Sequence, residues 1–190
     1  MSSSDPTPPY LAQGCVTPYP RGEVVLRWCW ALVQATLFRW SPRPCHGWRA
    51  RLLRWFGATI PEPGQVVVFP TVRVLHPWKL TLEPRSMLGR DVVVYNPGHI
   101  TLQYGANVSQ ASHLCAGTHD YTRWSMPLEA RPIVIGRNAW VAADAFVGPG
   151  VTIGELCVIG ARAVVVRDQP PRMVCAGHPC RPLKPRPEPQ

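Results

Sequence analysis

The chain has 190 residues, of which 46% are hydrophobic, so it is long enough for one domain with a real core and terminal extensions. Its formal net charge of +9 favours anionic partners. Its seven cysteines are odd in number and lack a C-x-x-C pair, which argues against a disulfide framework and for a reducing compartment. No signal peptide is expected, because no charged segment precedes an apolar run at the N-terminus.

The first 60 residues differ in character from the rest of the chain. Residues 1–20 are rich in Pro and Ser and predict a flexible tail, whereas residues 21–60 are rich in Trp and Arg. Two short helices are expected here, over Glu23–Trp40 and Gly47–Phe56, separated by a proline-containing break. The first is too short and too interrupted to span a bilayer. Two interpretations remain open: a helical cap that covers the open end of a β-coil, or a helix that lies on a membrane surface.

From Ile135 onward an aliphatic residue recurs at every sixth position. A period of six fits neither an α-helix nor a single strand and is typical of a parallel β-helix, in which three units close one triangular coil. The aliphatic side chain is expected to point inward, a small residue to fit near each corner, and the following Gly to permit the turn. The aliphatic positions are Ile135, Val141, Val147, Ile153, Ile159 and Val165.

The same period occurs upstream with two interruptions. Between Val94 and Leu102 the step is eight, so two residues are expected to bulge out around Asn96. Between Leu114 and Ile135 the step is twenty-one, so a loop over residues 115–132 must leave the coil. The β-domain is expected over residues 61–178, followed by a basic, Pro-rich tail over residues 179–190.

Several motifs resemble those of the hexapeptide-repeat acyltransferases. They are Ile135-Gly-Arg-Asn-Ala-Trp140-Val-Ala-Ala, Val147-Gly-Pro-Gly-Val-Thr-Ile-Gly154 and the ending Ala176-Gly177-His178-Pro179-Cys180-Arg181. The loop Thr118-His119-Asp120-Tyr121 is similar to that of the subgroup associated with colanic acid and other exopolysaccharides. The resemblance implies a mainly β fold, a left-handed parallel β-helix with a short helical cap and an extended C-terminal tail. It also implies a cytoplasmic homotrimer with active sites between subunits.

The resemblance further implies an O-acetyltransferase that uses acetyl-CoA as co-substrate and a sugar or glycoside as acceptor. No metal and no nucleic-acid partner are expected, and a peripheral contact at the inner face of the membrane is left open. His119 takes the place of the catalytic base, and Asn96 and Asp120 are expected to bind the acceptor. The residues expected to bind acetyl-CoA are Trp140, Ala143, Ala161, Val166, Arg167, Arg181 and Lys184.

The chemistry of the residues supports some of these roles independently. Imidazole titrates near neutrality, so His119 can accept a proton from a sugar hydroxyl as attack begins. Arg and Lys side chains suit the phosphates of CoA, and this favours a phosphate contact for Arg181 and leaves one for Lys184 open. For Asp120, a role in orienting a substrate and a role in capping a turn both remain open. Two other hypotheses stand beside this one. They are a metal-dependent β-helix enzyme of the γ-carbonic-anhydrase type, with ligands among His76, His99, His113 and His119, and a non-catalytic scaffold with a membrane face.

Overall fold

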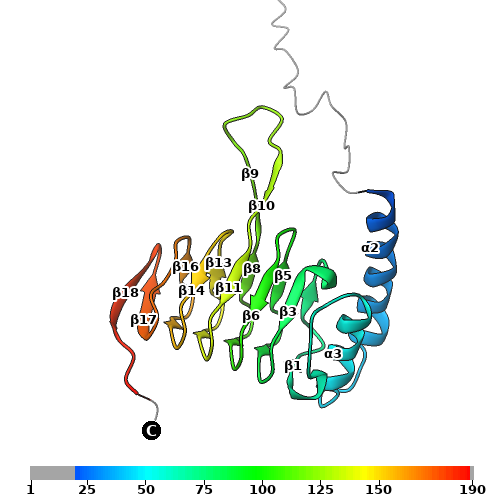
Figure 1. Cartoon of the computed structure of the whole chain (residues 1–190), viewed down its shortest axis with the longest axis horizontal. Coiled ribbons are helices and arrows are strands. Elements are labelled where there is room, and N and C mark those ends of the chain that lie inside the picture. Colours follow the sequence, from blue (N-terminus) through cyan, green and yellow to red (C-terminus); the bar gives the residue numbers. More distant parts are fainter. Residues whose placement is uncertain (1–19, 189–190) are drawn as a thin grey trace, which may run out of the picture.

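The structure, a computed structural model, describes residues 20–188. The expected tail over residues 1–20 therefore lies almost wholly outside the described residues. Helices come first, then a stack of short parallel strands, and the C-terminus lies at the far end of the stack from the helices (Figure 1). The helices are α2 (Arg21–Val33), the π-helix η1 (Gln34–Phe38) and α3 (His46–Trp55), with the 3-10 turns η2 (Pro63–Gln65) and η3 (Pro77–Lys79).

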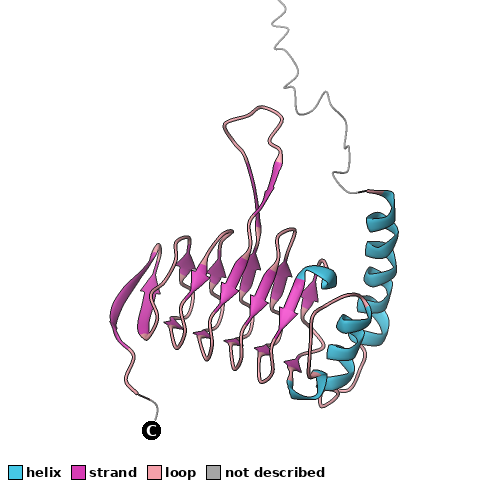
Figure 2. Ribbon diagram, viewed as in Figure 1, coloured by secondary structure: helices cyan, strands magenta, loops and turns pink. Residues whose placement is uncertain are grey.

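The strands of the coil form three sheets that wrap around one core (Figure 2), and they are parallel except for the last strand of sheet B, β18, which pairs antiparallel with β17. Sheet A contains β3 (Leu80–Leu82), β6 (Ile100–Leu102), β11 (Ile133–Ile135) and β14 (Thr152–Ile153). Sheet B contains β1 (Val67–Val68), β4 (Met87–Leu88), β7 (Asn107–Val108), β12 (Trp140–Val141), β15 (Val158–Ile159), β17 (Met173–Gly177) and β18 (Cys180–Pro185). Sheet C contains β2 (Arg73–Val74), β5 (Val93–Tyr95), β8 (His113–Cys115), β13 (Phe146–Val147) and β16 (Val164–Val165). The chain visits A, B and C in turn, which is the β-helix that the period of six predicts.

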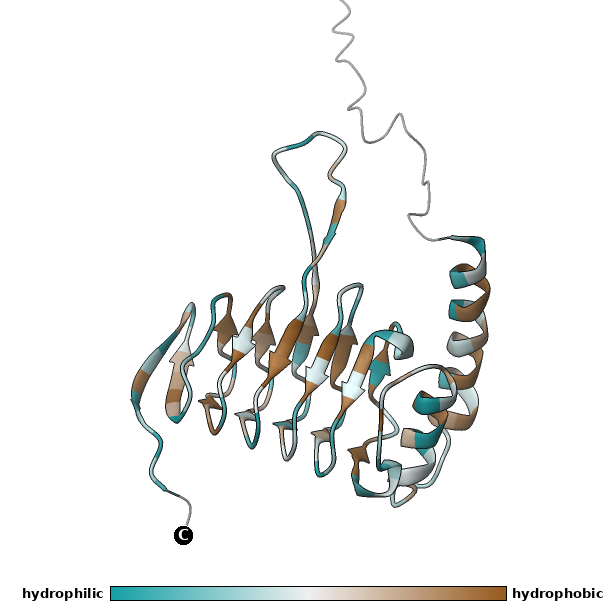
Figure 3. Ribbon diagram, viewed as in Figure 1, coloured by the Kyte–Doolittle hydropathy of each residue, from teal (hydrophilic) through white to brown (hydrophobic). Residues whose placement is uncertain are grey.

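Each turn of the coil takes 18 residues where the repeat is regular, because Ile135 pairs with Ile153 and Val141 with Ile159. The aliphatic residues of the repeat are completely buried, and hydrophobic colour follows the strands in Figure 3. The small residues also fill the interior, as predicted. Ala139, Ala145 and Cys157 are at most 1% exposed.

The reason for the repeated glycines differs from the expectation. Gly136 and Gly154 do not have the left-handed backbone that only glycine adopts easily; that conformation falls instead on residues such as Asn138 and Asp144. Gly136 is required by close approach, since a Cβ there would lie 2.6 Å from the carbonyl oxygen of Ile153 in the next turn. The stacking of turns, rather than the turn itself, selects glycine.

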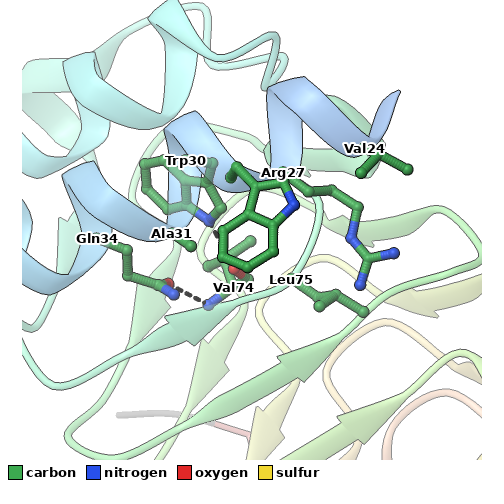
Figure 4. Close-up of a pocket in the computed structure, with 8 residues that line it drawn as sticks. Val24, Arg27, Trp30, Ala31, Gln34, Val74 and Leu75 are labelled. Carbon is green, nitrogen blue, oxygen red and sulfur yellow. Dashed lines mark hydrogen bonds between the residues drawn. The ribbon is translucent and has the colours of Figure 1, made fainter. Parts of the chain in front are cut away.

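The segment over residues 21–60 covers the open end of the first coil, as the interpretation of a helical cap expects. In sheet C, Val74 of the edge strand β2 forms two hydrogen bonds to the cap, as Figure 4 shows. Its N–H donates to Gln34 Oε1 (2.7 Å), and its carbonyl oxygen accepts from Trp30 Nε1 (2.7 Å). In sheet B, the Val68 carbonyl accepts from Arg49 Nε (2.6 Å). In sheet A, the N–H of Thr59 donates to the Leu80 carbonyl (2.9 Å). The cap therefore forms hydrogen bonds to the first strand of each of the three sheets.

Candidate active site

The loop between Leu114 and Ile135 is a β-hairpin that projects away from the coil (Figure 1). Its strands are β9 (Gly117–His119) and β10 (Leu128–Ala130), which pair antiparallel with His119 opposite Leu128. The hairpin leaves after β8 of sheet C and returns to β11 of sheet A. It therefore stands on the corner between sheets C and A, here called the CA corner.

His119 is exposed on this hairpin and its imidazole is held in one tautomer. Its Nδ1 lies 2.6 Å from the carbonyl oxygen of Met126. A carbonyl can only accept, so Nδ1 carries the proton and donates. In the neutral ring Nε2 then keeps its lone pair and faces away from this bond. The geometry leaves a proton acceptor at Nε2. No sequence pattern indicates the Met126 contact, because every residue has a backbone carbonyl.

Asp120, next to His119, is bound to its own turn. Its Oδ1 accepts from the hydroxyl (2.6 Å) and the N–H (3.0 Å) of Thr122, and these bonds lower the pKa of the Asp120 carboxyl. This is the usual arrangement of an Asx turn. The carboxylate stabilises the hairpin, and the imidazole of His119 is oriented by Met126 instead.

Asn96 lies where the eight-residue step predicts a bulge, and the bulge sits under the hairpin base. A Cβ on Gly98 would clash with the carbonyls of Ala116 and Arg131, which shows how closely the two segments pack. Asn96 itself is completely buried. Its side-chain amide bonds the backbone of His76 (2.9 and 2.7 Å) and of Lys79 (3.0 Å). In the single chain Asn96 therefore stabilises the coil, which argues against the expected direct contact with an acceptor.

Three of the expected CoA-binding residues share the outer side of sheet B. Trp140 aligns in register with Val158, then Val174, then Lys184, so three strand spacings, about 14 Å, separate Trp140 from Lys184. Arg181 pairs with Ala176, two residues after Val174, and so faces the same side. Trp140 is 43% exposed and donates from Nε1 to Ser109 Oγ (2.9 Å). This row offers an aromatic surface at one end and two cations at the other.

Ala143 and Ala161 border the same row. They lie 18 residues apart on the corner between sheets B and C, and the N–H of Arg162 donates to the Ala143 carbonyl (2.9 Å). Ala143 is half-buried and Ala161 is exposed. The N–H of Ala142 is bonded to the Ile159 carbonyl (2.9 Å) and is therefore not free to stabilise an oxyanion.

Val166 and Arg167 lie elsewhere. They follow β16 of sheet C and so stand on the CA corner, two turns beyond the hairpin, since Leu114 aligns with Val147 and Val147 with Val165. Both are exposed. One chain thus carries its expected site residues in two groups: His119 and Arg167 along the CA corner, and the row from Trp140 to Lys184 on sheet B.

The basic tail also divides by role. Arg186 donates from its side chain to the carbonyls of Asn138 (3.1 Å) and Leu156 (3.0 Å), and its N–H donates to the Arg172 carbonyl (2.8 Å). Arg186 therefore fastens the tail to the coil. Arg181 and Lys184 remain exposed on β18 with no acidic partner within the described residues.

Two features of the described residues bear on the alternative hypotheses. Among residues 20–188, no group of three or more His, Cys, Asp or Glu side chains is arranged to hold a metal ion. Over the same residues, none of the helices combines the length and apolar character that crossing a bilayer requires.

Comparisons with known proteins agree with this architecture. The family described as "Bacterial transferase hexapeptide (six repeats)" matches residues 132–167. A candidate colanic acid biosynthesis acetyltransferase of Escherichia coli K12, WcaF, is 44% identical over 167 residues, which are 88% of this chain and 91% of that protein.

Solved structures share the fold. A maltose O-acetyltransferase from Clostridium difficile 630 has a TM-score of 0.78 and 25% identity over 89% of this chain and 90% of its own. A hexapeptide-repeat acetyltransferase of Vibrio cholerae O1 biovar eltor, complexed with acetyl coenzyme A, has a TM-score of 0.75 and 22% identity over 88% and 91% of the two chains. The expected left-handed parallel β-helix is confirmed. With a relative of this identity aligned along nearly its whole length, the chain belongs to the hexapeptide-repeat acetyltransferase family.

Proposed function

We propose that this protein transfers the acetyl group of acetyl-CoA to a hydroxyl of a sugar or glycoside, with His119 as general base. The observation that carries the proposal is the bond from His119 Nδ1 to the Met126 carbonyl, which leaves Nε2 as a proton acceptor on an exposed hairpin. The names of the relatives point the same way. One is assigned to colanic acid biosynthesis, one acetylates maltose and one binds acetyl coenzyme A.

The proton balance of the reaction suits a single imidazole. His119 Nε2 takes the proton of the acceptor hydroxyl while the oxygen attacks the thioester carbonyl. When the tetrahedral intermediate collapses, the C–S bond breaks and the imidazolium returns the proton to the sulfur of CoA. Nδ1 stays bonded to Met126 throughout, so the ring keeps its orientation. No acyl-enzyme is needed, because both substrates are held together.

We propose that the active site forms between two chains of a homotrimer. His119 and Arg167 stand on the CA corner, whereas Trp140, Arg181 and Lys184 lie on the outer side of sheet B. The hairpin projects away from its own coil, and Tyr121 at its tip is 86% exposed. The CA corner of one chain packed against sheet B of the next would unite the base with the cation row and cover the hairpin. Asp120 then supports the hairpin fold, and Asn96 supports the coil beneath it.

We also place the protein in the cytoplasm, where acetyl-CoA is made and consumed. The cysteines of the described residues are free, which suits a reducing compartment. An acetyl donor supplied on that side would reach the site without crossing a membrane.

The test is the kinetics of His119→Ala with acetyl-CoA and a panel of glycosides. Loss of a positioned base should lower kcat by about 100- to 10,000-fold, while CoA binding, measured by calorimetry, and the sedimentation coefficient stay unchanged. Arg85→Gln, at an exposed position between β3 and β4 and away from both groups of site residues, is the control and should retain full activity. Turnover of His119→Ala within about threefold of wild type, less than base loss predicts, would reject His119 as the base.

A further inference from the structure

The cap carries a second surface that folding does not use. Val25, Trp28, Leu32, Leu37 and Trp40 on α2 and its continuation, with Trp55 on α3, are each 55–84% exposed. We call these six residues the outer cap surface. Exposure of this many large apolar side chains together marks an interaction surface rather than scattered surface residues. In Figure 3, hydrophobic colour recurs along the whole of α2.

Helix geometry explains why these residues form one stripe. Trp28 and Leu32 are four residues apart, one turn of an α-helix. The next step, from Leu32 to Leu37, is five residues and spans the π-helix η1, whose turn is one residue wider. The extra residue therefore keeps Leu37 in line with Leu32. Trp40 follows three residues later, and the stripe from Val25 to Trp40 is about 22 Å long.

The stripe continues onto α3 through Trp48. Its Nε1 donates to the Leu37 carbonyl (3.3 Å), and its ring meets Trp55 edge to face with centroids 5.7 Å apart. A shallow hollow of about 420 Å³ opens here, lined by Leu37, Trp40 and Trp48 among others. The two helices thus present one continuous apolar surface.

The opposite side of the same helices performs the capping. Trp30 and Phe38 are at most 2% exposed, and Trp30 and Gln34 point toward Val74 in Figure 4. The outer residues are not needed for that contact. The helices can therefore cap the coil with one side and contact a membrane surface with the other.

The charges around the surface have one sign. Residues 21–56 contain seven arginines and one acidic residue, Glu23. Glu23 faces the coil, with Oε1 3.8 Å from His76 Nε2 and 4.0 Å from Lys79 Nζ. Arg39, Arg51 and Arg54 are exposed beside the tryptophans. Trp and Arg together match the interface of a bilayer, where indoles sit at the headgroup level and guanidinium groups bind lipid phosphate.

We propose that the outer cap surface docks on the surface of an anionic lipid bilayer, with α2 lying in the plane of the interface. Tryptophans 28, 40 and 55 insert at the headgroup level, and Arg51 and Arg54 bind lipid phosphates. The contact is peripheral, since the described helices cannot span a bilayer. It holds the hexapeptide coil beside the membrane and does not depend on the identity of the acetyl acceptor.

The test is co-sedimentation of the full chain with vesicles of phosphatidylcholine alone or mixed with phosphatidylglycerol. We expect binding to the mixed vesicles that weakens from 0.1 to 1 M NaCl, as the Debye length falls from about 10 to 3 Å. Arg51→Gln with Arg54→Gln should weaken it by about fivefold per arginine. Trp28→Gln with Trp40→Gln and Trp55→Gln should weaken it by about tenfold per tryptophan inserted.

Matched controls separate this surface from general charge and stickiness. Arg85→Gln with Arg90→Gln removes equal charge from exposed positions on the coil, and Trp124→Gln removes an exposed indole from the hairpin. Both should bind vesicles like wild type. The cap variants should keep the wild-type circular dichroism, sedimentation coefficient and acetyl transfer to a soluble glycoside. Equal binding by the cap variants and the wild type would overturn the proposal. So would a change in sedimentation coefficient for the tryptophan variant, which would assign the surface to contact between copies.

Discussion

Arg49 provides a quantitative test of how the cap is attached. It is completely buried in α3 and has no acidic partner among residues 20–188, and burial lowers the pKa of its guanidinium. Its donors are satisfied by the carbonyls of Val68, Pro42 and Arg43 and by the hydroxyl of Ser41, at 2.6 to 2.9 Å. One side chain thus ties the helix, the proline-containing break and the edge of sheet B together.

Arg49→Met keeps much of the apolar volume and removes every donor. A hydrogen bond to a charged group contributes about 1.5–3 kcal/mol, and a stranded buried acceptor costs about 1–3 kcal/mol. When both members of a buried ion pair are replaced by apolar groups, no unpaired polar group remains. Here the backbone carbonyls stay in place, so Arg49→Met leaves them buried without donors. His46 Nδ1 also lies 2.9 Å from the Val68 carbonyl and can compensate in part. Allowing for this, we expect a loss of about 3–5 kcal/mol.

At about 2–4 °C per kcal/mol for a chain of this length, the melting temperature should fall by about 10 °C. Thermal unfolding followed by circular dichroism measures it. The melting temperature of Arg49→Lys should lie between those of Arg49→Met and the wild type, since an ammonium group can bond some but not all of these acceptors. A shift below about 3 °C for Arg49→Met would refute the reasoning and show that water reaches these carbonyls.

Three other predictions concern the donor site, the core and pH. Arg181→Ala and Lys184→Ala should each raise the KM for acetyl-CoA, by about tenfold to a hundredfold for Arg181, and steady-state kinetics that show no change would remove them from the phosphate site. Ile153→Asp puts a charge at a completely buried position of the coil, at a cost of several kcal/mol, so it should fail to fold; a soluble product with the wild-type circular dichroism would contradict this. Burial lowers the pKa of His76 and His113 below the usual 6.5, so the folded state resists their protonation. The free energy of unfolding should therefore be highest above about pH 6.5, where both histidines are neutral in the folded and unfolded states, and should decrease as pH falls below it. A melting temperature that stays constant down to about pH 5 would exclude this effect.

The coil was predictable from the sequence because its signal is strictly local. An inward aliphatic residue at each sixth position fixes the core, and breaks in that period locate both the bulge at Asn96 and the hairpin that carries His119. The cap was predictable as a pair of helices, since Pro42 and Pro44 interrupt an otherwise helical stretch. Its contacts were not, because Trp30 and Gln34 reach residues forty positions away.

The site was predictable in composition and only partly in arrangement. The period of six places Trp140 and Arg167 on different faces of the coil, because Val141 and Val165 are four units apart, but it cannot place His119, which lies on a hairpin outside the repeat. Nor can it reveal the tautomer of His119, which depends on a backbone carbonyl at Met126. Asn96 shows the converse. A polar residue in a bulge suggests a ligand, whereas the bulge closes on itself and the amide bonds the backbone.

The hairpin begins and ends at neighbouring points, because the N–H of Arg131 donates to the carbonyl of Ala116 (3.0 Å). The coil therefore closes on itself beneath the hairpin as though nothing were inserted. Replacement of residues 117–130 by a hairpin of another length or sequence would leave the register of every later turn, and so the row from Trp140 to Lys184, unchanged. Under the proposed function, a hairpin taken from a relative and keeping a histidine at the position of His119 should therefore change the surroundings of the base while leaving the row on sheet B in place.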